Sequence, residues 1–262
     1  MPLLPRRFER LQAVLNRRMG DLTVVLEAVD KPHNLSAILR TCDAVGVLEA
    51  HVVSLPGRPR TFNKTAKGSQ KWVPLHPHPS IEGCLQGLKD QGFRIFGTHL
   101  SVDARDYRDC DFTGPSCFLM GAEKWGMSAE ALALVDQPLF IPMTGMVQSL
   151  NVSVAAATLL FEALRQRDRA GVVPSQGEGI PGGETAYRRL LFEALRQRHQ
   201  AGLVPSAGEG VPGGDAAYKR ILFEWAYPQV ADWCRRQGRP YPELTAEGEL
   251  AEELPRTLKL RY

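Results

Sequence analysis

Residues 141–157 read IPMTGMVQSLNVSVAAA, and this stretch decides the fold expected for the chain. It starts as a short apolar strand, passes through a loop of Pro, Gly and Met, and enters an Ala-rich helix opened by Gln148, Ser149 and Asn151. Helix starts leave backbone N–H groups unpaired and favour polar caps. A strand, a backbone-exposing loop and a polar helix start suit a small ligand or an anion. An ordinary turn between a strand and a helix has the same pattern.

The same alternation of strand and helix extends back to residue 22. Apolar segments predict strands at 22–26, 51–55, 72–75, 94–98, 117–120 and 139–141. Helical spacing predicts helices at 6–18, 81–91, 128–135 and from about 149, and Asn34 is expected to cap another that runs to about Val45. Gly46 is expected to stop that helix, and Ser128 to cap the helix at 128–135. The order predicts an α/β fold with a mostly parallel sheet and helices on both faces. Ligands of such sheets bind beyond the carboxyl ends of the strands, where segments 30–40, 98–100, 121–126 and 141–151 lie.

The composition excludes several classes of protein. The 262 residues are 44% apolar and 23% charged, which is typical of a globular chain, and no apolar run is long enough to span a membrane. The first ten residues do not resemble a secretory signal. Five scattered cysteines, none in C-x-x-C spacing, favour reduced thiols in the cytoplasm. His76 and His78 could bind a metal ion, but alternate residues at the end of a strand give the same spacing, and we expect no metal.

Positive charge is concentrated in two segments, although the net charge is only +3. Residues 1–18 hold five arginines and one glutamate, and residues 58–71 hold five basic residues and no acid. Such clusters suit a phosphate backbone, while a solvated helix face and an exposed loop remain an alternative. The candidate RNA-binding residues are Arg6, Arg7, Arg10, Arg17, Arg18, Arg58, Arg60, Lys64, Lys67 and Lys71.

The C-terminal third contains a tandem repeat. Residues 159–189 and 190–220 are identical at 23 of 31 positions, and each copy contains LLFEALRQR followed by a Gly/Pro/Ser-rich loop. Two copies are too few for a solenoid, so the repeat is interpreted as a segmental duplication that adds a helical hairpin. The G-x-G-x-x-G matches at 177 and 208 follow helices rather than strands, so they indicate turns and not a dinucleotide site.

Three segments, in their order along the chain, resemble the SPOUT superfamily of RNA methyltransferases, and within it the TrmH (SpoU) group. They are NLSAILRTCDAVGV at 34–47, FLMGAEKWG at 118–126, and the 141–157 stretch. The resemblance implies an α/β core tied in a deep trefoil knot. It also implies a basic N-terminal helix at 1–20, a methyltransferase domain at 21–170 and a helical extension at 171–262.

The resemblance further implies transfer of a methyl group from S-adenosylmethionine to the ribose 2′-hydroxyl of a D-loop guanosine of tRNA, at position 18. The residues that match catalytic positions are Arg40, Asn34, Glu123, Ser149 and Asn151. Those that match the cofactor-binding loops are Thr98, His99, Leu100, Gly121, Ile141, Met146 and Leu150. Members of the group are homodimers that bind tRNA, and their knot regions face each other.

Two other functions are compatible with the same motifs. The chain could methylate ribosomal RNA, although related enzymes of that kind usually carry a separate N-terminal RNA-binding domain, and only about twenty residues precede the first expected strand. It could also be an idle RNA-binding module of the same fold, which would need none of Asn34, Arg40, Ser149 and Asn151. Arg40 lies about 240° around the helix from Asn34, so it would reach a shared site by its long side chain or across an interface.

Overall fold

The computed structural model describes residues 5–29, 31–54, 72–122, 125–173, 214–245 and 249–251. These residues belong to two compact units. The larger extends from residue 18 to residue 173, and the smaller contains α1 (Pro5–Leu15), α8 (Gly214–Ala226) and α9 (Pro228–Gln237). The expected domain boundaries at residues 20 and 170 stay a prediction.

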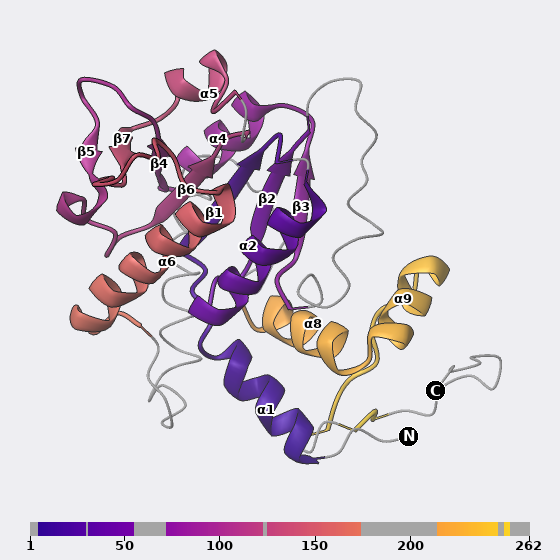
Figure 1. Ribbon diagram of the computed structural model, residues 1–262. Helices are drawn as coiled ribbons and strands as arrows, with labels where there is room; N and C mark the ends of the chain where they lie inside the picture. The colour runs from indigo at the N-terminus through magenta and orange to yellow at the C-terminus, as the bar shows by residue number, and fades with distance from the viewer. Residues whose placement is uncertain are drawn as a thin grey trace. The chain divides into compact units, whose positions relative to one another are not determined.

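The larger unit is built on a parallel sheet in the order β3-β2-β1-β6-β4-β7-β5 (Figure 1). Its strands are β1 (Leu22–Glu27), β2 (Ala50–Val53), β3 (Leu75–His78), β4 (Arg94–Thr98), β5 (Arg105–Asp106), β6 (Ser116–Met120) and β7 (Gln137–Phe140). Each of their pairings is parallel. The predicted α/β class with a parallel sheet is therefore confirmed.

Alternate strand residues separate two apolar cores. Val24, Leu26 and Phe118 face one side of the sheet, where α2 (Pro32–Val45) and α6 (Val152–Arg169) pack against each other. Val25 and Leu119 face the other side, which is covered by α4 (Ile81–Lys89) and α5 (Ala129–Ala133). Because successive side chains of a strand point to opposite faces, uninterrupted apolar runs are what a sheet covered on both faces requires.

Several elements begin or end at other residues than expected. The strand expected at 72–75 is β3, three residues later, and its Pro77 is tolerated because β3 is an edge strand. The helix expected to begin at Asn34 begins at Pro32, a residue favoured at the first helical position, and Lys31 precedes it. Its stop at Gly46 is confirmed, with a left-handed φ of 87°. The first helix, α1, ends at Leu15, before Arg17 and Arg18.

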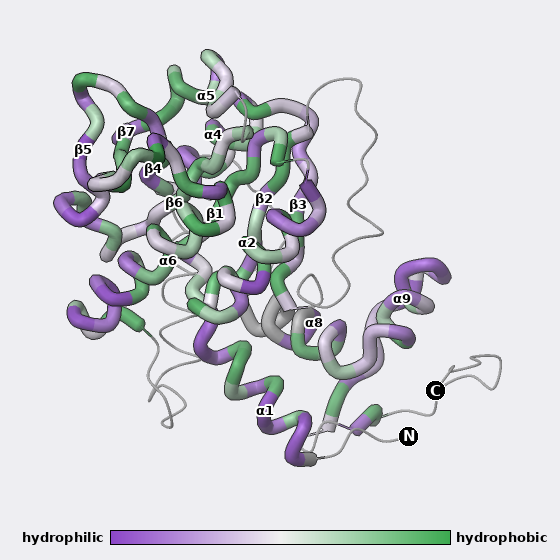
Figure 2. Tube along the Cα trace, in the orientation of Figure 1, coloured by the Kyte–Doolittle hydropathy of each residue, from purple (hydrophilic) through white to green (hydrophobic). Residues whose placement is uncertain are grey.

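The smaller unit is helical in its described part. Phe8, Leu11 and Leu15 of α1 are buried, and α1 packs against α8. Figure 2 shows α1 alternating between apolar and polar residues along its length. Phe223 of α8 packs with Val230 and Cys234 of α9 and stacks on Tyr241. The amphipathic N-terminal helix expected from the sequence is therefore present, and its apolar face is buried within this unit.

Candidate active site at the carboxyl edge of the sheet

Four loops leave the sheet at its carboxyl edge from the neighbouring strands β1, β6, β4 and β7. They begin at residues 28, 121, 99 and 141, and so coincide with the segments predicted from the sequence. His99 N donates to Leu139 O at 3.0 Å, which joins the loop after β4 to β7. The parallel topology thus gathers these segments along one edge.

The clearest contact at this edge joins the first turn of α2 to the start of α6. Asn151 donates from Nδ2 to Asn34 Oδ1 at 3.2 Å, across 117 positions of sequence. The other end of the same amide caps α6, since Asn151 Oδ1 accepts from Ser153 N at 2.9 Å. Asn34 is 1% exposed, and its side chain does not cap α2 as expected. The structure therefore brings together two of the five predicted catalytic residues.

The loop after β6 is a closed turn. Ala122 and Gly126 exchange two backbone hydrogen bonds of 2.8 Å, and Gly126 has a φ of 68°. A Cβ on Gly121 would lie 2.3 Å from the carbonyl carbon of Gly126, so only glycine fits there. The predicted catalytic Glu123 lies outside the described residues.

Glu27 is a buried carboxylate at this edge that the sequence analysis missed. It ends β1, is 5% exposed, and accepts from the backbone N–H of Ser128 at 3.0 Å. Ser128 in turn caps α5 through its hydroxyl, as predicted. The sequence did contain a signal for this residue, because Glu27 is an acid at the end of an otherwise mostly apolar strand. Glu27 ties the loop after β6 to β1, so it positions that loop.

Several apolar side chains are exposed along the same edge. Leu100 is 75% exposed, Met146 is 99% exposed, and Leu150 is also exposed. His99 is exposed, while Thr98 and Ile141 are half-buried. Exposed apolar side chains next to a tight glycine turn suit a ligand with a flat apolar part.

Arg40 and Ser149 are exposed in the single chain. Within the described part of the chain, no hydrogen bond joins Arg40 to Asn34, Ser149 or Asn151. Arg40 lies on the outer side of α2, as its angular separation from Asn34 led us to expect. One protomer thus does not bring all of the predicted catalytic residues into contact.

The predicted RNA-binding arginines separate into two groups. Arg6, Arg7 and Arg10 are exposed on α1, opposite its buried apolar face. The prediction that Arg18 binds RNA is wrong. Arg18 is 2% exposed, pairs with Asp43 and donates to Val47 O at 3.1 Å. It stabilises the fold and cannot reach an RNA phosphate. Arg17 is half-buried, and Arg58, Arg60, Lys64, Lys67 and Lys71 lie outside the described residues.

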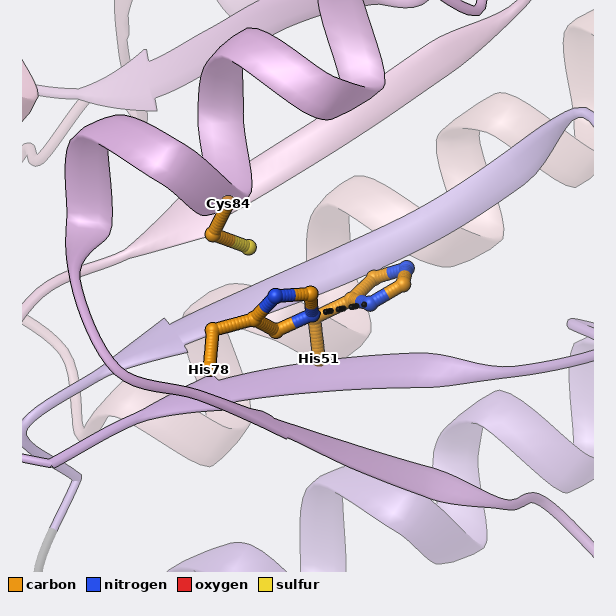
Figure 3. Close-up of side chains that lie close together, drawn as sticks. All are labelled: His51, His78 and Cys84. Carbon is orange, nitrogen blue, oxygen red and sulfur yellow. Dashed lines mark hydrogen bonds between the residues drawn. The ribbon is translucent and has the colours of Figure 1, made fainter. Parts of the chain in front are cut away.

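A second group of polar side chains lies under α4, on the other face of the sheet. His51 Nδ1 and His78 Nε2 are 3.0 Å apart, and the Cys84 thiol is directed at them (Figure 3). Burial lowers the pKa of His51 to about 4 and raises the pKa of Cys84 to about 12. The sequence analysis paired His76 with His78, whereas the fold pairs His78 with His51.

A family model described as SpoU rRNA Methylase family matches residues 21–161, more than half of the chain. The chain belongs to the SpoU rRNA methylase family. A second model of this family, described as SpoU, rRNA methylase, C-terminal, matches residues 196–253. The resemblance stated from the three motifs is thereby confirmed.

For two relatives, the match to this chain covers most of the relative's own length. A tRNA (guanosine(18)-2′-O)-methyltransferase of Thermus thermophilus is 61% identical over 63% of this chain and 86% of its own. The enzyme of the same name from Escherichia coli is 44% identical over 94% of this chain and 93% of its own.

Solved structures of the SpoU family share the fold. The Aquifex aeolicus TrmH/SpoU tRNA modifying enzyme has a TM-score of 0.61 at 36% identity, over 76% of this chain and 98% of its own. An AdoMet-bound rRNA methyltransferase from Sinorhizobium meliloti has a TM-score of 0.51 at 30% identity, over 58% of this chain and 59% of its own. Among the described residues, no helix is both long and apolar enough to cross a membrane.

Proposed function

We propose that this protein transfers a methyl group from S-adenosylmethionine to the ribose 2′-hydroxyl of guanosine 18 in tRNA. The observation that carries the proposal is the Asn151–Asn34 hydrogen bond, which joins the first and last motifs at the carboxyl edge of the sheet. Relatives named for this activity are 61% and 44% identical to the chain.

The same edge fits S-adenosylmethionine in its chemistry. Leu100, Met146 and Leu150 offer exposed apolar surface for an adenine ring. The closed turn that begins at Gly121 leaves the same edge of the sheet. The residues that would hold the cofactor are Thr98, His99, Leu100, Gly121, Ile141, Met146 and Leu150. When bound, S-adenosylmethionine supplies an electrophilic methyl group.

Arg40 acts on the ribose. In-line transfer forms a carbon–oxygen bond as the carbon–sulfur bond breaks, and the hydroxyl proton must leave. A guanidinium stays charged in proteins, so Arg40 orients the 2′-hydroxyl and stabilises the negative charge that develops on its oxygen. The proton leaves late, to solvent or to an RNA phosphate. Asn34, Ser149 and Asn151 hold this arrangement in place, and much of the acceleration comes from alignment. Glu123 stays a predicted catalytic residue that lies outside the described residues.

Two copies of the chain complete the site. Val154 and Phe161 are exposed on α6 and seven residues apart, which places them on one face two turns apart. Val147, which is 61% exposed, is a further apolar side chain in the loop before α6. A homodimer through this face would cover it and would bring the partner's Arg40 toward the cofactor loops. Val154→Asp should convert dimer to monomer in light scattering, and a wild-type monomer would contradict the pairing.

The chain is further proposed to carry the trefoil knot of its family. After β7, the chain returns through residues 141–151 to α6, which packs against α2 on the face of the sheet that holds Phe118. The loops after β6 and β7 leave the same edge of the sheet, which supports this proposal. A backbone trace of the cofactor-bound protein tests this proposal.

A tRNA substrate is consistent with a cytoplasmic protein, which we propose here. The arginines of α1 are proposed to bind tRNA phosphates. Arg6, Arg7 and Arg10 are exposed together on one helix. Changing all three to Gln should weaken tRNA binding and lower its salt dependence, because each lost phosphate contact reduces the slope by about 1. Arg236→Gln, which removes an exposed arginine paired with Asp232, is the control.

The function is tested by labelled methyl transfer to an unmodified tRNA transcript, followed by mapping of the modified nucleotide. We expect one 2′-O-methylguanosine at position 18, and Arg40→Ala should abolish transfer while tRNA binding persists. Methylation of ribosomal RNA in place of tRNA would favour the ribosomal alternative. Binding of tRNA without any transfer by the wild-type protein would identify an idle binding module.

A further inference from the structure

The cluster of His51, His78 and Cys84 lies apart from the proposed active site. His51 is in register with Val25 of β1, a residue that belongs to the core under α4. The Asn34–Asn151 contact belongs to α2 and α6, on the opposite face of the sheet. The cluster therefore has no part in the chemistry proposed above.

Three elements direct ligand-forming atoms toward one point. His51 comes from β2, His78 from the end of β3, and Cys84 from the first turns of α4 (Figure 3). One ligand atom from each residue lies within 4.8 Å of the other two, and the nearest histidine nitrogens are 3.0 Å apart. Two nitrogens bound to a tetrahedral zinc ion would be about 3.3 Å apart. The histidine pair thus already has nearly the spacing of two ligands of one ion.

We propose that His51, His78 and Cys84 bind one divalent transition-metal ion of the zinc class, with solvent in the fourth position. Imidazole nitrogen and thiolate sulfur are the ligands that such ions prefer. The Cys84 thiol gives up its proton to the solvent when the metal–sulfur bond forms.

The ion would fasten the edge of the sheet. β3 has four residues and, among the described strands, pairs only with β2, because it lies at the end of the strand order. In sequence, β2 and β3 are the strands joined by the basic segment 58–71. A metal that cross-links β2, β3 and α4 would fix the two ends of that segment and raise the stability of the larger unit.

The test uses the full-length protein without a histidine tag, treated with chelator and then titrated with Co²⁺. One equivalent of Co²⁺ should produce a sulfur-to-cobalt charge-transfer band, which Zn²⁺ should abolish by displacement. Zn²⁺ should also raise the melting temperature of the wild-type protein. A wild-type protein that gives no charge-transfer band, or binds well below one equivalent, overturns the proposal whatever the variants do.

Three variants assign the ligands. Cys84→Ser should remove the charge-transfer band. Loss of a residue that only hydrogen-bonds to a metal ligand weakens metal binding by about 10–100-fold, and His78→Ala should weaken Zn²⁺ binding by more than this. His76→Gln is the matched control, because His76 lies on the same strand but pairs with Glu49, and it should keep the band. A band that survives in Cys84→Ser, or is lost equally in His76→Gln, contradicts the ligand set. Circular dichroism confirms that each variant is folded.

Discussion

At the scale of single residues, Asn151 does two things with one amide group. Its oxygen caps α6, and its nitrogen donates to the buried Asn34 on α2. An amide can do both at once because its oxygen accepts while a separate NH₂ group donates in another direction. The two motifs that are farthest apart in sequence are thereby held together by one residue.

Replacing Asn151 separates the two roles. Asn151→Ser keeps a capping oxygen but loses the donor to Asn34, whereas Asn151→Ala loses both. We expect the two variants to lose methyl transfer to a similar degree, and the alanine variant to be less stable than the serine variant by about 1 kcal/mol. Single-turnover kinetics and urea denaturation measure the two effects. Wild-type transfer by Asn151→Ser would show that the Asn34 contact is dispensable.

Gly121 carries a second prediction at this scale. Gly121→Ala forces the backbone of Gly126 to move, so binding of S-adenosylmethionine should fall sharply in calorimetry. Gly87→Ala is the control, since a Cβ there meets nothing within 4 Å and alanine favours α4 by up to about 1 kcal/mol. Unchanged cofactor binding by Gly121→Ala would contradict the proposed place of this turn in the site.

At the scale of elements, α6 is anchored at both ends. Asn151 fixes its start at the carboxyl edge of the sheet, and Arg167 fixes its last turn at the opposite edge. The buried Arg167 guanidinium donates to Asp21 Oδ1 and to Gly114 O at 2.6 Å, and to Phe112 O at 2.9 Å. A helix held in this way keeps the loop at residues 141–151 in a fixed register with the sheet.

Loss of the hydrogen bonds made by Arg167 should lower the stability of the protein. Arg167→Met removes the guanidinium donor from the Asp21 carboxylate and from the carbonyl oxygens of Asp21, Phe112 and Gly114. The free energy of unfolding should therefore fall by roughly 3 kcal/mol or more. Arg165→Met, on the same helix, removes an exposed arginine paired with Glu162 and should cost less than about 1 kcal/mol. Chemical denaturation followed by circular dichroism compares the two. Equal losses would contradict the anchoring role.

At the scale of the whole molecule, the tandem repeat is the feature that sets this chain apart from its family. The two family models match residues 21–161 and 196–253, which leaves residues 162–195 unmatched between them. That interval is close to one repeat of 31 residues. The extra copy is therefore best interpreted as an insertion that the methyltransferase fold does not require.

Deletion of residues 168–198 tests this interpretation. The shortened chain keeps LLFEALRQR through Arg167, and so keeps every buried residue of α6. It should methylate tRNA at the wild-type rate with an unchanged melting temperature. An equally long deletion of residues 214–244 removes α8 and α9, uncovers the apolar face of α1, and should lower stability. Loss of activity in the first deletion would show that the second copy has a function.

Parts of this architecture could be predicted because they depend on neighbours in sequence. Apolar runs predicted six of the seven strands found in the described residues, and Ser128 and Gly46 were correct as a cap and a stop. The two-residue strand β5 was not found, since so short a segment has no periodicity. Arg18 was wrongly placed on the surface, because a basic residue next to other arginines gives no sign that Asp43 will bury it.

The sequence by itself determined the α/β class, the order of the motifs and the loops in which the candidate site would lie, because periodicity and cap residues act over a few positions. Only the tertiary structure decided which distant side chains meet. Asn34 meets Asn151, His51 meets His78 and Cys84, and Glu27 meets Ser128. These pairings follow from strand order and helix packing, which bring together residues that no local pattern relates.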